Sequence, residues 1–152
     1  MLTLLLIQAI ATFGALIFGR LAGRFGAKPT IMLTLVIWTG VVVYAYFIRT
    51  AGEFFILGAI VGLVMSGTQA LSRSLYGSMV PEGASAEFYG FYTVFSKFSA
   101  MWGPWAFAIV KQATGSSRLA ILSIVVLFLA GLLLLSLVDV DRAREARETR
   151  AF

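Results

Sequence analysis

Long apolar runs alternate with short polar or glycine-containing turns along the chain. A membrane-spanning helix needs about 20 mostly apolar residues, because each residue rises about 1.5 Å across a hydrocarbon core about 30 Å thick. The pattern therefore predicts an all-α membrane protein with five transmembrane helices. The predicted helices cover residues 1–19, 30–48, 54–75, 87–110 and 119–138.

The remaining residues, 139–152, alternate acids with arginines and predict a charged tail, either a solvated helix or a disordered segment. Short basic loops between spans mark the cytoplasmic side of a membrane protein. Applied here, this rule predicts that the first residue lies outside and that the tail is cytoplasmic. The eight basic residues on the predicted inner side are Arg20, Arg24, Lys28, Arg73, Arg142, Arg144, Arg147 and Arg150, and the three on the outer side are Arg49, Lys111 and Arg118.

Composition supports a membrane protein and narrows its chemistry. The chain is 60% hydrophobic and 12% charged, whereas soluble domains are about 45–50% apolar and about 25% charged. It has no cysteine and no histidine, so we expect no disulfide framework, no redox motif, no metal site and no cofactor. The net charge of +5 follows the loops and the tail and does not indicate a nucleic-acid partner.

An enzyme is not expected either. Without histidine, cysteine or a pair of acids at membrane depth, the sequence offers no nucleophile–base constellation. The chain is also apolar from its first residues, with no basic segment and no small-residue cleavage site, so it does not begin with a signal peptide. We therefore expect that it starts inside a longer protein.

Polar residues among the apolar helices concentrate between Gly67 and Met101. Gln69 and Arg73 are four residues apart, so one face of a helix carries both. The helix predicted over 87–110 has small and polar residues at a spacing of three and four, which predicts a face turned away from lipid. The residues of that face are Tyr89, Tyr92, Thr93, Ser96, Ser99 and Gly103.

Lys97 adjoins this face, about 14 Å along the helix from Phe88 and therefore near the membrane midplane. A lysine at the centre of a span costs about 2.5 kcal/mol or more, and the sequence has no acid at membrane depth. Lys97 is then either part of a substrate path, with Gln69, Tyr92 and Ser96 as hydrogen-bonding companions, or a snorkelling or packing residue. Its partner in the first case is an acid in absent sequence, a backbone carbonyl or an anionic group of the substrate.

Other pairs predict contacts between helices. Arg73 and Glu87 are expected to form an ion pair across the predicted inner loop between helices 54–75 and 87–110. This pair is either an inner gate or a static structural pair. Gln8 and Thr12 share a face and form either an interhelical hydrogen bond or a cavity-lining pair. The small residues Gly58, Gly62 and Ser66, spaced by four, predict a close approach of two helices, and Gly103-Pro104 predicts a kink.

The first predicted inner loop contains a recognisable arrangement of glycines and basic residues, with Gly19, Leu21, Ala22, Gly23, Arg24, Gly26 and Lys28 at their respective positions. It resembles the loop repeated in each half of major facilitator superfamily transporters, where it is a conformational latch. The usual acid of that loop is Gly23 here. The resemblance implies a gating role for Arg24.

A second block consists of Gln69 to Ser74, Pro81, Glu87 to Tyr92, Lys97 to Ser99, and Gly103 with Pro104. It resembles the vacuole-effluxer branch of the same superfamily, which includes the autophagy-linked vacuolar amino-acid exporters of fungi and many bacterial relatives. The resemblance covers nearly the whole chain, as the last five helices of a twelve-helix fold. It implies that helices 1–19, 54–75 and 87–110 face the central cavity, with the other two outside.

The resemblance implies the C-terminal part of a secondary active transporter that moves amino acids or similar small solutes by alternating access. Its partners would be the lipid bilayer, a small-molecule substrate and the missing N-terminal half. Its location would be a bacterial inner membrane, or the vacuolar membrane in a fungus. The alternative is a truncated or split membrane subunit that does not transport by itself and needs a partner half.

Overall fold

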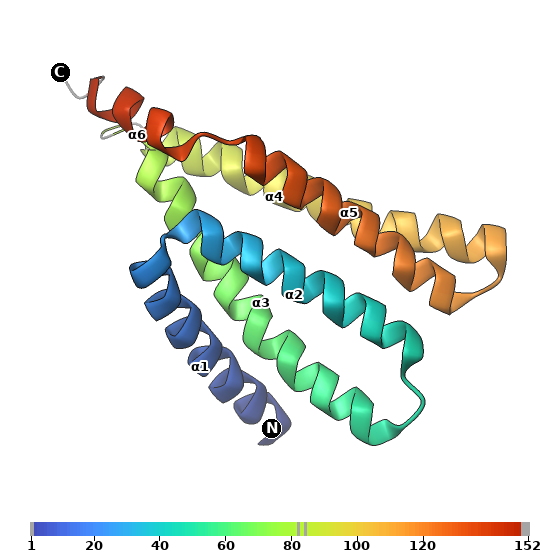
Figure 1. The fold of residues 1–152 in the computed structure, drawn as a ribbon. Coiled ribbons are helices and arrows are strands. Elements are labelled where there is room, and N and C mark those ends of the chain that lie inside the picture. The colour runs from blue at the N-terminus through green and yellow to red at the C-terminus, as the bar shows by residue number, and fades with distance from the viewer. Residues whose placement is uncertain (1, 82, 84, 150–152) are drawn as a thin grey trace.

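The computed structural model describes residues 2–81, 83 and 85–149, of which 2–9, 144 and 146–149 are described by their backbone alone. Within these residues the chain is helical, with short connections and no strand. Figure 1 shows the five long helices and the short helix that follows them. They are α1 (Leu2–Phe25), α2 (Ala27–Phe47), α3 (Ala51–Met79), α4 (Ser85–Thr114), α5 (Ser117–Leu137) and α6 (Val140–Thr149).

Three of these helices, α2, α3 and α5, are long and apolar enough to cross a membrane. The prediction of five transmembrane helices thus finds direct support for three. Helix α4 is 30 residues long, but its tyrosines, serines, threonines and Lys97 lower its hydropathy. In α1 the side chains are described only from Ile10 onward. The finding on length and hydropathy therefore does not cover the first apolar turns of α1.

The helices extend beyond the apolar segments from which they were predicted. The polar run from Ser66 to Ser74 stays helical, and α3 continues to Met79. At its other end α3 begins with a capping box. The Thr50 hydroxyl accepts a hydrogen bond from the Glu53 amide at 3.3 Å, and the Glu53 carboxylate accepts one from the Thr50 amide at 3.2 Å. The described part of the charged tail forms the helix α6.

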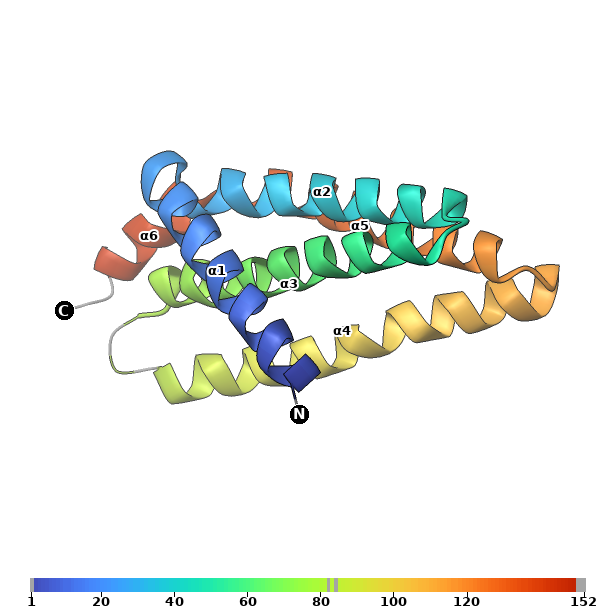
Figure 2. The same ribbon diagram turned by 90° about the horizontal axis from the view of Figure 1, so that it is seen from below.

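The helices pack unevenly. Helix α1 lies along α3, α2 rests on both α3 and α5, and α5 pairs with α4. Helices α3 and α4 follow each other in sequence but are not a closely packed pair. Figure 2 shows α4 standing apart from α3.

The buried core lies where α1, α2, α3 and α6 meet. Its buried members are Phe18, Ile31, Val64, Leu71, Leu75 and Val140. Val140 therefore attaches the start of the charged α6 to the bundle. In contrast, no described residue of α4 is buried.

The close approach between two helices occurs at α1 and α3. A Cβ atom added to Gly14 would overlap the carbonyl oxygen of Leu63, and one added to Gly67 would overlap the Phe18 ring. Between these contacts the Ser66 hydroxyl donates a hydrogen bond to the Ala11 carbonyl oxygen at 2.6 Å.

The predicted small-residue contact is thus correct at Ser66 but wrong for the outer end of the pattern. A Cβ on Gly62 would meet only a methyl group of Ile10 at 3.8 Å, and one on Gly58 would meet nothing. The reason is that the two helices diverge toward that end (Figure 1). The interhelical hydrogen bond predicted for the face of Gln8 and Thr12 depends on the Gln8 side chain, which lies outside the described ones. The predicted kink at Pro104, which lies inside α4, stays a prediction.

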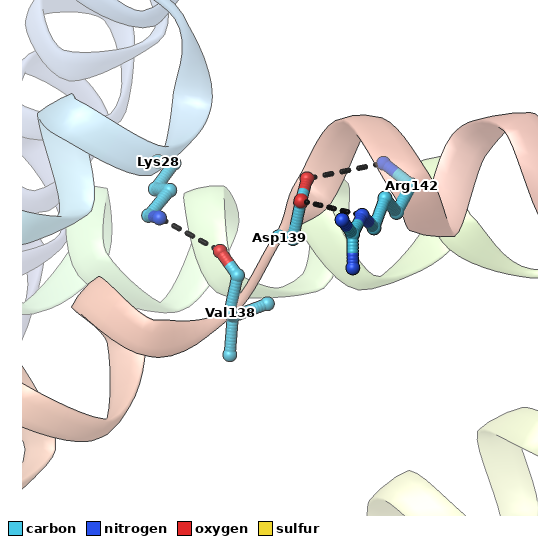
Figure 3. Close-up of polar contacts among 4 residues, drawn as sticks. All are labelled: Lys28, Val138, Asp139 and Arg142. Atoms are coloured by element: carbon cyan, nitrogen blue, oxygen red, sulfur yellow. Dashed lines mark hydrogen bonds and ion pairs between the residues drawn. The ribbon is translucent and has the colours of Figure 1, made fainter.

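The end of α5 is tied to the start of α2 by Lys28. Its Nζ donates hydrogen bonds to the carbonyl oxygens of Ser136 at 3.0 Å and Val138 at 2.7 Å. Ser136 lies in the last turn of α5, and Val138 is its C-cap residue. Carbonyl oxygens at the C-terminal end of a helix lack helical partners and favour a cation. Figure 3 shows the bond from Lys28 to Val138. Beside it lies Asp139, whose carboxylate accepts a hydrogen bond from the Arg142 amide at 3.1 Å and pairs with the Arg142 side chain at 3.3 Å.

Candidate binding groove

The divergence of α3 and α4 leaves a polar groove of about 740 Å³ between them. Helix α3 contributes one wall and α4 the other. The residues that line the groove are Ser66, Thr68, Gln69, Ala70, Ser72 and Arg73 from α3, and Tyr92, Thr93, Ser96, Lys97 and Ala100 from α4.

Helical spacing explains why these residues share one space. Gln69 and Arg73 are one turn apart on α3, and Tyr92, Ser96 and Ala100 recur every four residues on α4. The structure therefore brings together five residues that the sequence singled out, namely Gln69, Arg73, Tyr92, Ser96 and Lys97. Their roles in binding stay predictions.

Three hydroxyl groups of the groove are already engaged within the protein. Ser66 bonds to α1, as described above. The Thr68 hydroxyl donates to the Val64 carbonyl at 2.8 Å and accepts a hydrogen bond from the Trp38 indole at 3.4 Å. The Thr93 hydroxyl donates to the Tyr89 carbonyl at 2.8 Å. These groups stabilise the walls and have less capacity left for a ligand.

The other polar side chains are available. Gln69, Ser72, Arg73, Ser96 and Lys97 make no hydrogen bond or ion pair with any residue in the described part of the chain. All five are exposed or half-buried. Two of them, Arg73 and Lys97, carry positive charge, and they project from different walls. Every residue that lines the groove is described, and none of them is an acid.

An aromatic cluster of Tyr76, Tyr89 and Tyr92 joins α3 to α4 beside the groove, nearer the loop between the helices. The Tyr76 ring lies 5.8 Å from that of Tyr89 and 4.7 Å from that of Tyr92, measured between centroids. The Tyr76 hydroxyl also donates to the Phe88 carbonyl at 2.9 Å. Sequence reasoning missed Tyr76; its position, three residues after Arg73 on the same helix, was the available signal.

Glu87 does not join the groove. It lines a separate, mostly apolar depression with Tyr76, Phe88 and Phe91, and within the described residues it forms no ion pair with Arg73. The structure therefore lacks the predicted Arg73–Glu87 contact. The physical reason is the way the two helices are aligned. Arg73 lines the same groove as Tyr92 and Thr93, which lie more than one helical turn beyond Glu87 along α4.

Arg24 also lies away from the groove. It is exposed in the last turn of α1, where its guanidinium sits 5.9 Å from the centroid of the Phe25 ring. The contact that the loop makes with another helix comes from Lys28 instead. The gating role that the family resemblance implies for Arg24 stays a prediction.

Comparison with known proteins agrees with the resemblance to the vacuole-effluxer branch. Residues 1–148 match the family described as "Vacuole effluxer Atg22 like". An uncharacterized MFS-type transporter, YxiO, of Bacillus subtilis is 36% identical over 97% of the chain, which spans 35% of that protein. Autophagy-related protein 22-1 of Aspergillus niger is 39% identical over 60% of the chain, and autophagy-related protein 22-2 of Emericella nidulans is 33% identical over 87%.

The chain thus spans about a third of the length of the bacterial relative, and 15% and 25% of those two fungal relatives. No solved structure matches it. YxiO is described as a transporter and the two fungal relatives as autophagy-related proteins, and the long apolar helices α2, α3 and α5 agree with a membrane protein.

Proposed function

Because the chain belongs to the Atg22-like vacuole effluxer family of MFS-type transporters, we propose that it is the C-terminal part of a secondary transporter. In this proposal it moves amino acids or similar small solutes by alternating access. The observation that carries the proposal is the α3–α4 groove, whose free polar side chains lie between helices that are otherwise apolar.

The chain is a multi-pass membrane protein. We propose further that α1 and α4 also span the bilayer, which gives five spans, with the first residue outside and α6 in the cytoplasm. A bacterial cell membrane is the proposed location, or the vacuolar membrane in a fungal host. In this arrangement the polar face of α4 must turn away from lipid, because unpaired polar groups are costly there.

The groove also has the position that a solute site requires. Secondary transporters bind their solutes near the midplane, at the interface between structural repeats. Gln69, Ser96 and Lys97 lie in the middle parts of α3 and α4, far from both helix ends. Helices from the rest of a longer protein would close the open side of the groove, in keeping with the share of the relatives' length that this chain spans.

A second candidate function rests on the share of the bacterial relative's length that this chain spans. A chain that spans about a third of its bacterial relative provides one part of a machine whose alternating access needs two parts. Alone it would be a truncated or split subunit without transport activity. Coding sequence for about seven further helices, upstream or in a neighbouring gene, would favour the transporter.

Transport by the full-length protein tests the proposal. We would express the longest reading frame that encodes these residues, reconstitute it in vesicles and measure uptake of an amino-acid panel. We expect Lys97→Ala to lower transport about tenfold or more, because it removes a charged donor from the solute path.

The matched control is Lys111→Ala, which removes a lysine from the same helix but outside the groove. We expect it to transport as the unaltered protein does at equal membrane abundance. Equal transport by the unaltered protein and Lys97→Ala would contradict a binding role for Lys97 and make it a snorkelling residue.

A further inference from the structure

We infer that the α3–α4 groove selects solutes with a net negative charge and binds a carboxylate of the solute through Lys97 and Arg73. The inference rests on the proposed transport function, which leaves the charge of the solute open. It concerns the same groove and names the chemistry that its free side chains recognise.

The first argument is charge. Arg73 projects from α3 and Lys97 from α4 into one hollow, and none of its lining residues is an acid. The sequence contains no acid between Glu53 and Glu82 or between Glu87 and Asp139. Neither α3 nor α4 can therefore supply a carboxylate at this depth. Two cations that line one hollow attract an anion and repel a cationic solute.

The second argument is the inventory of free hydrogen-bonding atoms. Lys97 offers three N–H donors and Arg73 five, and neither has an acceptor. The amide of Gln69 adds two further donors, and its oxygen is the only free acceptor in the groove besides the hydroxyl oxygens. A ligand that satisfies this set must be rich in acceptors. A carboxylate fits, because it accepts charge-assisted hydrogen bonds and matches the fork of an arginine.

The third argument is that the engaged groups leave this donor set intact. Thr68 and Thr93 bond to carbonyls of their own helices, and Ser66 bonds to α1. Arg73 and Lys97 keep no partner among the described residues. A groove of about 740 Å³ is within the usual range for small-molecule sites, so there is room for a solute of amino-acid size as well as for its hydration.

A carboxylate for these cations has two possible sources: the solute, or an acid in another part of a longer protein. We assign it to the solute. If acids of the protein paired with both Lys97 and Arg73, the groove would be electrically neutral before the solute arrived. It would then treat an acidic solute and its neutral amide alike.

Matched pairs of solutes separate the two sources. L-glutamate with L-glutamine, and L-aspartate with L-asparagine, differ in charge but hardly in size. Binding is measured as protection of a single cysteine, Ala100→Cys, from a thiol reagent. The chain has no native cysteine, and Ala100 lines the groove. We expect the acid to protect at a concentration about tenfold lower than its amide.

Substituted proteins then test which residues cause the preference for the acid over its amide. In the Ala100→Cys background, Lys97→Gln and Arg73→Gln should each reduce the preference to about threefold or less. Lys111→Gln, outside the groove, should keep the full preference. A preference for the acid that survives in both groove variants, or equal protection by acid and amide, would overturn the inference.

Transport of the same solutes is measured in parallel, so that the two proposals fail separately. Protection by the acid without transport would contradict the proposed function and support the inference. Transport of acid and amide at equal rates, with equal protection, would support the proposed function and overturn the inference. If neither acid protects the cysteine, the inference is also overturned, whatever the transport result.

Discussion

On one side of α3, helix α1 lies so close that glycine is needed at both Gly14 and Gly67. On its other side, α4 stands away and leaves a polar hollow of about 740 Å³. Membrane helices gain little from hydrophobic burial against each other, because lipid is equally apolar. Their association depends on backbone proximity and hydrogen bonds, which α3 has with α1 and mostly lacks with α4.

The residues on the two faces of α3 account for this contrast. Toward α1 it presents Gly67, which is buried against the Phe18 ring, and Ser66, which hydrogen-bonds across the interface. Toward α4 it presents Gln69 and Arg73, whose long polar side chains need space and a partner. The first face closes an interface, and the second keeps a groove available for a ligand.

The largest expected effect on stability comes from filling the closed interface. Gly14→Ala and Gly67→Ala should each destabilise the protein by about 1–3 kcal/mol, because the added methyl group overlaps the Leu63 carbonyl or the buried Phe18 ring. Thermal unfolding in detergent measures the change.

The control for this prediction is Gly58→Ala, because Gly58 lies on α3, as Gly67 does, but has open space around it. Alanine favours a helix over glycine by about 1 kcal/mol, so this variant should be as stable as the unaltered protein or slightly more so. Similar destabilisation by all three substitutions would show that the α1–α3 contact is not specific.

A smaller and more local effect is expected at Lys28. Lys28→Met keeps the apolar stem but removes the donor to the Ser136 and Val138 carbonyls, at a cost of about 1 kcal/mol. Amide hydrogen exchange should then become faster from Val138 to Ala143, where the end of α5 and the start of α6 lose an anchor.

Arg24→Met is the control for that measurement, because Arg24 sits in the same loop region and makes no hydrogen bond or ion pair with any residue that the structure describes. Its exchange pattern around Val138 should match that of the unaltered protein. Equal acceleration in both variants would mean that loop charge in general, and not the Lys28 contact, holds the tail.

Local patterns of sequence were enough to predict an all-helical membrane protein and the residues that share the groove. The spacing of Gln69 with Arg73, and of Tyr92 with Ser96, needs only helical geometry. These inferences succeed because they depend on a single helix at a time.

Contacts between helices were harder to predict, because spacing does not identify the partner. The pattern of Gly58, Gly62 and Ser66 predicted a close approach but not that it would centre on Gly14 and Gly67. Likewise, charge alone suggested a pair between Arg73 and Glu87, which the alignment of the two helices prevents. Lys28 was recognised as a loop cation, yet its acceptors lie more than 100 residues away in sequence.

The central claim is that the α3–α4 groove is a wet path for a solute and that the opposite face of α4 meets lipid. The most direct measurement is the rate at which single cysteines on α4 react with a charged, membrane-impermeant thiol reagent. Ser96→Cys places the thiol in the groove, and Val94→Cys places it on an exposed apolar position two residues away.

A thiol reacts as its thiolate, which forms readily in water and hardly at all in lipid. The account predicts fast modification of Ser96→Cys, slowed by a transported solute, and little modification of Val94→Cys. Equal reaction rates at the two positions, or a faster rate at Val94→Cys, would contradict the claim that the groove is the solute path.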